Sequence, residues 1–123
     1  MNSIFFKKCQ LRMISKHLSE PWFSYVEQGK KTIEGRLERE EWSKIKPGDI
    51  IEFYNSDTGS KRAFQVKVVD IKKYSSFKSL INTEGLNNIL PGVTSLEEGI
   101  KIYEKIYGST PNHNILGIKL QKL

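Results

Sequence analysis

Hydrophobic and polar residues alternate in several short segments of the chain, and this period of two predicts β-strands. The clearest segment is residues 32–37, where a hydrophobic residue or glycine occupies every second position. The other predicted strands span residues 50–54, 62–74 and 115–120. In the longest of them the alternation slips at Val68 and Val69, which indicates a β-bulge. Because a bulge bends a strand, this segment suits the curved sheet of a small barrel.

Three segments carry the signals of helices. The first spans residues 19–29, with Ser19 as its N-terminal cap. The second begins at Ser75 or Ser76, and the third begins with a capping box at residues 95–98. Strands predominate in the first half of the chain and helices in the second. The expected fold class is therefore α+β, a small open or closed β-barrel with flanking helices.

The composition is that of one globular domain. The chain has 123 residues, of which 37% are hydrophobic and 28% are charged, so it is neither disordered nor large enough for two ordinary domains. No hydrophobic run approaches the roughly 18 residues that a membrane-spanning helix needs, and residues 4–6 are too few for a signal-peptide core. The single cysteine, Cys9, cannot form an internal disulfide. We therefore expect a cytoplasmic protein that does not enter a membrane.

Positive charge is concentrated in two segments. The 20 Lys and Arg residues outnumber the 14 Asp and Glu residues, which gives a net charge of +6. Residues 1–19 and 61–78 carry the excess, whereas residues 20–60 are acidic. If the basic segments lie side by side, they form a positive strip that attracts phosphates. The predicted phosphate-binding residues are Lys61, Arg62, Lys72 and Lys73. The alternative is that these side chains are ordinary solvated surface.

Residues 29–36 combine side chains that can bind a nucleotide. Glu34 and Arg36 are two apart on a predicted strand, so their side chains leave the same face roughly 6 to 7 Å apart and can pair. Lys31 lies at the junction of helix and strand and can turn toward the same side. An ammonium, a carboxylate and a guanidinium around one cavity suit a nucleobase edge and its phosphate. In the alternative interpretation, Glu34 and Arg36 form only a structural ion pair.

The same stretch resembles a family signature. Residues 29–36 fit the pattern Gly-x-Lys-x-x-Glu-x-Arg, which is typical of the ASCH family within the PUA-like superfamily. Five later segments are similar to landmarks of its small archaeal and bacterial members, namely residues 46–53, 69–77, 89–91, 103–107 and 116–120. The resemblance begins near residue 13. We therefore expect a short N-terminal extension over residues 1–12 and a single ASCH domain over residues 13–123.

The resemblance implies a small β-barrel with a cleft lined by Lys31, Glu34 and Arg36. PUA-like domains commonly bind RNA or modified bases, so the expected partner is RNA, single-stranded nucleic acid or a nucleoside. Further candidates for ligand contacts lie beside the motif or at strand ends, and these are Thr32, Tyr54, Asn55 and Tyr74. No cofactor is expected. His17 and His113 lack the neighbouring ligands that a metal site needs.

A subset of the family implies an alternative function. These members hydrolyse the acetyl amide of acetylated cytidine with a lysine, a threonine and a glutamate. Lys31 matches the lysine, but Glu34 stands at the threonine position, and Pro91 and Gly92 offer no carboxylate at the third. The alternative is a hydrolase of acylated cytidine or RNA that uses Lys31 and Glu34 as catalytic residues. A third hypothesis is a protein-interaction module in which the motif only braces the fold.

Aromatic residues outside the motif are mostly assigned to packing. Tyr103 and Tyr107 continue a hydrophobic stripe at helical spacing, and Trp22 is expected in the core. Trp42 lies among charged residues and leaves two interpretations open. Its indole either covers one end of the barrel or stacks on a base.

Overall fold

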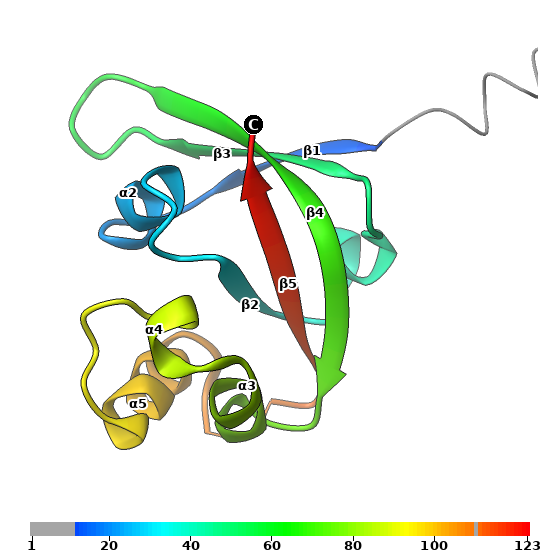
Figure 1. The fold of residues 1–123 in the computed structure, drawn as a ribbon, viewed down its shortest axis with the longest axis vertical. Coiled ribbons are helices and arrows are strands. Elements are labelled where there is room, and N and C mark those ends of the chain that lie inside the picture. Colours follow the sequence, from blue (N-terminus) through cyan, green and yellow to red (C-terminus); the bar gives the residue numbers. More distant parts are fainter. Residues whose placement is uncertain (1–11, 110) are drawn as a thin grey trace, which may run out of the picture.

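A single curved sheet forms the centre of the protein. The computed structural model describes residues 12–109 and 111–123. Five strands lie in the order β1-β3-β4-β5-β2, and the sheet curls into a half-barrel (Figure 1). β1 pairs with β3 in parallel, and the other neighbours are antiparallel. The strands are β1 (Met13–His17), β2 (Ile33–Leu37), β3 (Ile50–Asn55), β4 (Arg62–Tyr74) and β5 (Ile115–Lys122). The predicted α+β class with a small barrel is confirmed, and of the two forms left open by the sequence the barrel is the open one.

The helices gather in two places around the sheet. The three helices that follow β4 lie together at one end of the sheet, while α2 lies beside β3 near the other end (Figure 1). A short 3-10 helix, η1, follows β2. The helical elements are α2 (Trp22–Glu27), η1 (Glu40–Lys44), α3 (Phe77–Glu84), α4 (Leu86–Ile89) and α5 (Leu96–Tyr107).

The predicted strands form, and so does the predicted bulge. The pairing of β4 with β5 shifts its register between Val68 and Asp70, which leaves Val69 as the extra residue with 42% of its surface exposed. β1 and η1 were not predicted. The five residues of β1 are too few for a clear alternation, and β1 is held as a strand by pairing with β3.

Two of the three predicted helix caps are present. The hydroxyls of Ser76 and Ser95 accept hydrogen bonds from backbone amides in the first turns of α3 and α5. The prediction that Ser19 caps the first helix is wrong, because α2 begins only at Trp22. The carboxylate of Glu20 takes the role instead and accepts the backbone N–H of Ser24 at 2.9 Å.

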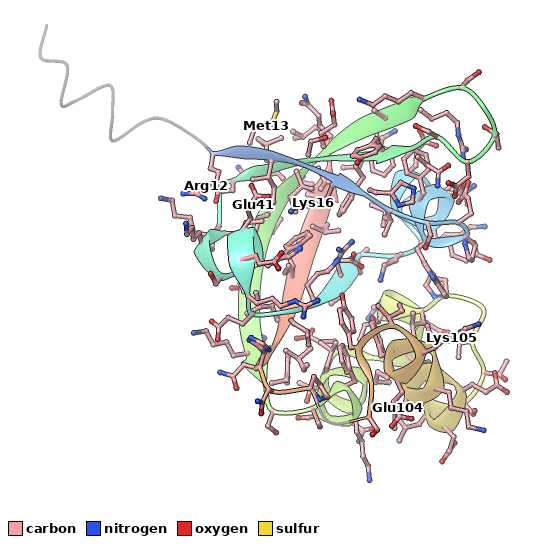
Figure 2. All side chains as sticks on the ribbon, turned by 180° about the vertical axis from the view of Figure 1, so that it is seen from behind. Arg12, Met13, Lys16, Glu41, Glu104 and Lys105 are labelled. Carbon is pink, nitrogen blue, oxygen red and sulfur yellow. The ribbon has the colours of Figure 1, made fainter. Side chains whose placement is uncertain are left out.

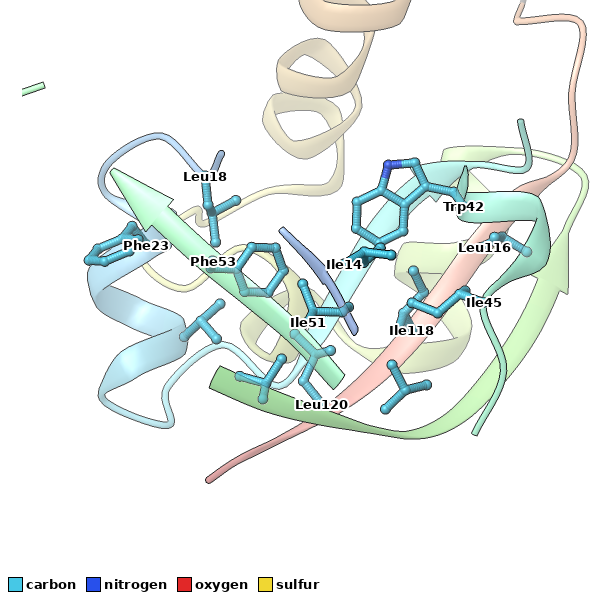
Figure 3. Packing of buried hydrophobic residues seen from close by; sticks show 13 residues of the cluster. Ile14, Leu18, Phe23, Trp42, Ile45, Ile51, Phe53, Leu116, Ile118 and Leu120 are labelled. Atoms are coloured by element: carbon cyan, nitrogen blue, oxygen red, sulfur yellow. The ribbon is translucent and has the colours of Figure 1, made fainter. Parts of the chain in front are cut away.

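The hydrophobic core has two parts, one on each face of the sheet. The first part fills the inside of the half-barrel, with Trp42 toward one end of the cluster and Phe23 toward the other (Figure 3). The second part lies between the sheet and α3, α4 and α5, and includes Leu80, Ile115 and Tyr103. The motif strand β2 therefore has a packed layer on both faces.

A pair of glycines lets α3 pack directly on the sheet. Gly35 on β2 lies opposite Gly117 on β5, and both face Leu80 of α3. A Cβ atom at Gly35 would lie 2.9 Å from a methyl carbon of Leu80, and one at Gly117 would lie 2.8 Å from the other. Real Cβ contacts do not approach this closely, so a side chain at either position would force the Leu80 side chain or its neighbours to shift.

We expect Gly117→Ala to lower the free energy of unfolding by about 1 to 3 kcal/mol, because the added methyl overpacks the contact with Leu80. Urea unfolding followed by circular dichroism measures the change. Gln121→Ala on the same strand is the control, since Gln121 is exposed and its truncation should shift the free energy by less than about 0.5 kcal/mol. Equal stability of Gly117→Ala and the wild type would contradict the packing argument.

Candidate functional site

A cavity of about 280 Å³ lies where the half-barrel stays open. β1 and β2 are the two edge strands of the sheet, and they do not pair with each other. Residues from the end of β1, from β2 and from α5 together line this cavity, so the open seam of the barrel becomes a pocket covered by a helix. The lining comprises His17, Leu18, Ser19, Trp22, Lys31, Glu34, Gly35, Arg36, Leu90, Ile102, Tyr103, Ile106 and Tyr107.

Lys31 is almost completely buried and has a full set of partners. Only 2% of its surface is exposed. Its Nζ atom donates to the backbone oxygens of Ile33 at 2.7 Å and Ile89 at 2.5 Å, and it lies 3.3 Å from Oε1 of Glu34. These three acceptors match the three hydrogens of an ammonium group. Lys31 therefore ties the start of β2 to the end of α4.

Glu34 is shared between two cations. One carboxylate oxygen lies near Lys31, and the other accepts a hydrogen bond of 2.8 Å from Nε of Arg36. The guanidinium of Arg36 lies over the Trp42 ring, with its central carbon 4.6 Å from the ring centroid. The structure records no hydrogen bond from the terminal nitrogens of Arg36 to another described residue. Lys31, Glu34 and Arg36, which the sequence predicts to lie around one hollow, all line this cavity.

The charges in this group hold one another in place. Burial opposes ionisation of Glu34, but Arg36 and Lys31 outweigh that effect and place the pKa of Glu34 below its ordinary value. Burial lowers the pKa of Lys31, and the attraction of Glu34 offsets only part of this effect. At neutral pH the cavity therefore presents an ionised carboxylate beside a guanidinium.

Aromatic side chains form the other walls. Tyr103 and Tyr107 reach the cavity from α5, and both rings stack on Phe77 with centroid distances of 4.1 and 5.6 Å. Burial raises the pKa of Tyr103 well above its ordinary value, so its hydroxyl stays protonated. That hydroxyl is buried and has no hydrogen-bond partner within the described part of the chain. Trp22 adds a third aromatic surface.

Four other candidates lie away from this cavity. Thr32 lines a separate hollow of about 270 Å³ on another part of the surface. Asn55 is buried and holds the chain together, because its side-chain amide donates to the backbone oxygen of Leu18 at 2.9 Å. The Tyr54 ring contacts His17 edge-on, with the ring centroids 5.5 Å apart, but does not line the cavity, and the Tyr74 hydroxyl bonds to Glu84.

The predicted phosphate-binding residues do not form one strip beside the cavity. Lys61 directly precedes β4 and Arg62 begins it, whereas Lys72 and Lys73 lie near its other end, ten or more residues further along the strand. Arg62 pairs with Glu20 at 3.1 Å, and Lys73 pairs with Glu38 at 2.6 Å. Lys7 and Lys8 of the other basic segment lie outside the described residues, as do residues 1–11 of the predicted N-terminal extension.

Two basic residues near the cavity were not predicted. The guanidinium of Arg39 lies 5.7 Å from the ring centroid of Tyr107, and its side chain is exposed. His17 lines the cavity and lies 3.6 Å from the carboxylate of Asp57. Nearby, Lys16 of β1 is neutralised by Glu41 of η1 at 2.7 Å, and the two side chains lie together at this side of the molecule (Figure 2).

Comparison with known proteins identifies the family. The family model of the ASCH domain matches residues 17–118. The chain belongs to the ASCH domain family. This family is generally linked to RNA binding. The matched range runs from the end of β1 into β5 and includes Lys31, Glu34 and Arg36, so the cavity lies inside the family's common fold.

Solved structures resemble this ASCH domain closely. The crystal structure of the hypothetical protein PH0355 has 39% sequence identity and a TM-score of 0.78, over 90% of this chain and 99% of that one. The solution structure of protein PF0455 from Pyrococcus furiosus has 35% identity and a TM-score of 0.70, over 93% of this chain and 98% of that one. No curated protein matches this ASCH domain. None of the helices in the described residues has the length and hydrophobicity that a membrane-spanning segment requires.

Proposed function

We propose that this ASCH domain binds RNA and accepts a single nucleotide, with an ordinary or modified base, in the cavity between β1 and β2. The observation that carries the proposal is the convergence of an ionised carboxylate, a guanidinium and aromatic walls on one hollow of about 280 Å³. Pockets for drug-sized ligands measure roughly 300 to 1,000 Å³, so this hollow suits one base or nucleoside and not a longer segment.

The chemistry of the lining favours a base over a phosphate inside the cavity. The ionised carboxylate of Glu34 repels an anion, but it accepts hydrogen bonds from the N–H groups of a base edge. The terminal nitrogens of Arg36 donate to ring nitrogens or carbonyl oxygens. Trp22 and Tyr107 offer aromatic surface against which a flat ring can stack. The sugar and phosphate would then remain outside, near the exposed guanidinium of Arg39.

We expect binding of a short single-stranded RNA to weaken as salt rises, because phosphate contacts release counterions. Fluorescence anisotropy at several salt concentrations measures the slope of log affinity against log salt. Arg39→Ala should lower affinity and reduce the magnitude of that slope by about 1, the change expected on loss of one phosphate contact. Arg36→Ala should lower affinity and leave the slope unchanged, because Arg36 faces the base.

The control for both variants is Lys122→Ala, which removes an exposed positive charge at the far end of β5. It should bind RNA like the wild type. Affinity that does not depend on salt, or the absence of RNA binding even at low salt, would contradict the proposal.

The hydrolase alternative has less support from the same geometry. A lysine that attacks or accepts a proton needs a free amine, whereas Nζ of Lys31 has three acceptors around it. Because the pKa of Glu34 lies below its ordinary value, its carboxylate is a weak base at neutral pH. Incubation with acylated cytidine and with labelled RNA tests this alternative, and release of product that Lys31→Ala abolishes would favour it.

A further inference from the structure

The second edge of β2 faces the cavity. The backbone oxygen of Thr32 accepts the N–H of Leu120 at 2.8 Å, and the N–H of Glu38 donates to Asn114 at 2.8 Å. Even-numbered residues of this segment therefore direct their peptide groups toward β5 and the chain beside it. From the opposite side, the backbone oxygen of Ile33 accepts a hydrogen bond from Lys31. Odd-numbered residues consequently direct their peptide groups away from β5.

Gly35 is the middle odd-numbered position of β2, and its peptide groups border the cavity. Since glycine has no side chain, the atoms through which Gly35 lines the cavity belong to its backbone. The neighbouring odd-numbered oxygens already have partners, because Ile33 is bonded by Lys31 and the oxygen of Leu37 accepts the N–H of Arg39 at 2.9 Å. Gly35 pairs with Gly117 at a non-hydrogen-bonded position of the β2–β5 ladder, and no hydrogen bond from its N–H or C=O to a described residue outside the ladder is present. The N–H and C=O of Gly35 are therefore free to pair with a ligand, as the edge of a strand pairs with a neighbouring strand.

The hydroxyl of Tyr103 lies over the same position. A Cβ atom at Gly35 would lie 2.9 Å from this oxygen, so the hydroxyl is within a few ångströms of the Gly35 backbone. It is buried and without a partner in the described part of the chain. A buried hydroxyl without a partner destabilises a protein, so its presence beside a cavity points to a bound group that completes it.

From this arrangement we infer that the ligand of the cavity presents a lactam edge, an N–H beside a C=O in one flat ring, to Gly35 and Tyr103. The ring N–H donates to the oxygen of Gly35. The ring carbonyl accepts from both the N–H of Gly35 and the hydroxyl of Tyr103, which requires an acceptor with two lone pairs. A carbonyl oxygen has two, whereas a ring nitrogen has one. The inference rests on the proposed function and narrows its ligand to bases of the uracil or guanine type.

The test uses nucleosides that differ only at this edge. Uridine and guanosine are compared with N3-methyluridine and N1-methylguanosine, in which a methyl group replaces the edge hydrogen, and with cytidine, whose edge lacks the lactam N–H. The full chain labelled with ¹⁵N is titrated with each nucleoside and followed by NMR. We expect uridine or guanosine to shift the amide resonance of Gly35. The methylated forms and cytidine should bind at least about tenfold more weakly, since two hydrogen bonds are lost.

Two tyrosine variants separate a role in binding from a role in folding. Tyr103→Phe should weaken binding of uridine or guanosine about three- to tenfold, because one hydrogen bond is lost, without lowering the thermal midpoint of the free protein. The matched control is Tyr74→Phe, which removes a hydroxyl bonded to Glu84 outside the cavity. It should lower the thermal midpoint and leave nucleoside binding unchanged.

Three outcomes would overturn the inference. If methylated nucleosides bind as well as their parents while Arg36→Ala still lowers affinity, the lactam edge is wrong and the proposed function stands. If Tyr103→Phe lowers the thermal midpoint and leaves binding unchanged, the hydroxyl is structural. If neither nucleosides nor RNA bind, the inference and the proposed function fail together.

Discussion

Replacing Glu34 with alanine should lower the free energy of unfolding by about 3 to 5 kcal/mol, because the change leaves Lys31 and Arg36 without their shared anion. Loss of the anion destabilises the protein more through Lys31 than through Arg36, because Lys31 is almost fully buried and cannot reach water. Urea unfolding at neutral pH measures the loss. The matched control is Glu41→Ala, which breaks an exposed pair with Lys16 and should leave the unfolding midpoint unchanged.

The pH dependence of the free energy of unfolding is a second way to measure how much the ionised Glu34 carboxylate stabilises the protein. The fold places the pKa of Glu34 below its ordinary value of 4.5, so its stabilising contribution is complete above about pH 4.5 and is lost as the pH falls through the lower value in the folded protein. Glu34→Gln keeps the shape of the side chain but cannot titrate. Its stability should therefore fall less steeply than that of the wild type over the same acid range. Parallel acid profiles would show that Glu34 is not the group that responds.

The three motif residues divide two tasks between them. Lys31 braces the fold, because its partners belong to β2 and to the end of α4, 58 residues away along the chain. Arg36 lines the cavity, and Glu34 contacts both Lys31 and Arg36. A motif that braces the fold and a motif that binds a ligand are thus compatible here. The interaction-module hypothesis, in which the motif only stabilises the fold, does not explain why polar side chains line the cavity.

The polar part of the site could be predicted from sequence spacing, whereas its walls could not. Two residues on one strand face the same way regardless of what surrounds them, so the pairing of Glu34 with Arg36 follows from local geometry. The helical spacing of Tyr103 and Tyr107 is equally typical of a buried stripe. That these rings border a cavity depends on where α5 crosses the open seam of the sheet, and no local pattern encodes this.

The same distinction applies to the fold. The alternation in β4 and its slip at Val69 are local signals, and the strand and its bulge were predicted. β1 has no such signal and is a strand because β3 lies beside it. The charge pattern did not reveal how the basic residues are placed, because those predicted to bind phosphate lie near opposite ends of the long strand β4. Nearness in sequence is a poor guide to nearness in space along an extended strand.

Trp42→Ala should lower the free energy of unfolding by about 3 to 5 kcal/mol, the range for removing a large buried aromatic side chain. Trp42 is buried at one end of the barrel core, and the guanidinium of Arg36 covers its ring. Of the two interpretations left open by the sequence, the structure therefore favours packing. Loss of the ring also removes the surface that positions Arg36, so RNA affinity should fall in any protein that remains folded.

Fluorescence distinguishes the two tryptophans in the same experiment. Trp22 lines the cavity, whereas Trp42 lies behind Arg36, so a bound base should quench Trp22 and leave Trp42 unchanged. Trp42→Phe and Trp22→Phe each leave one indole as the reporter, and both keep an aromatic ring in place. We expect RNA to quench the fluorescence of Trp42→Phe and to have little effect on that of Trp22→Phe. The reverse result would mean that the base stacks on Trp42, in which case Arg36 must leave its position over that ring when RNA binds.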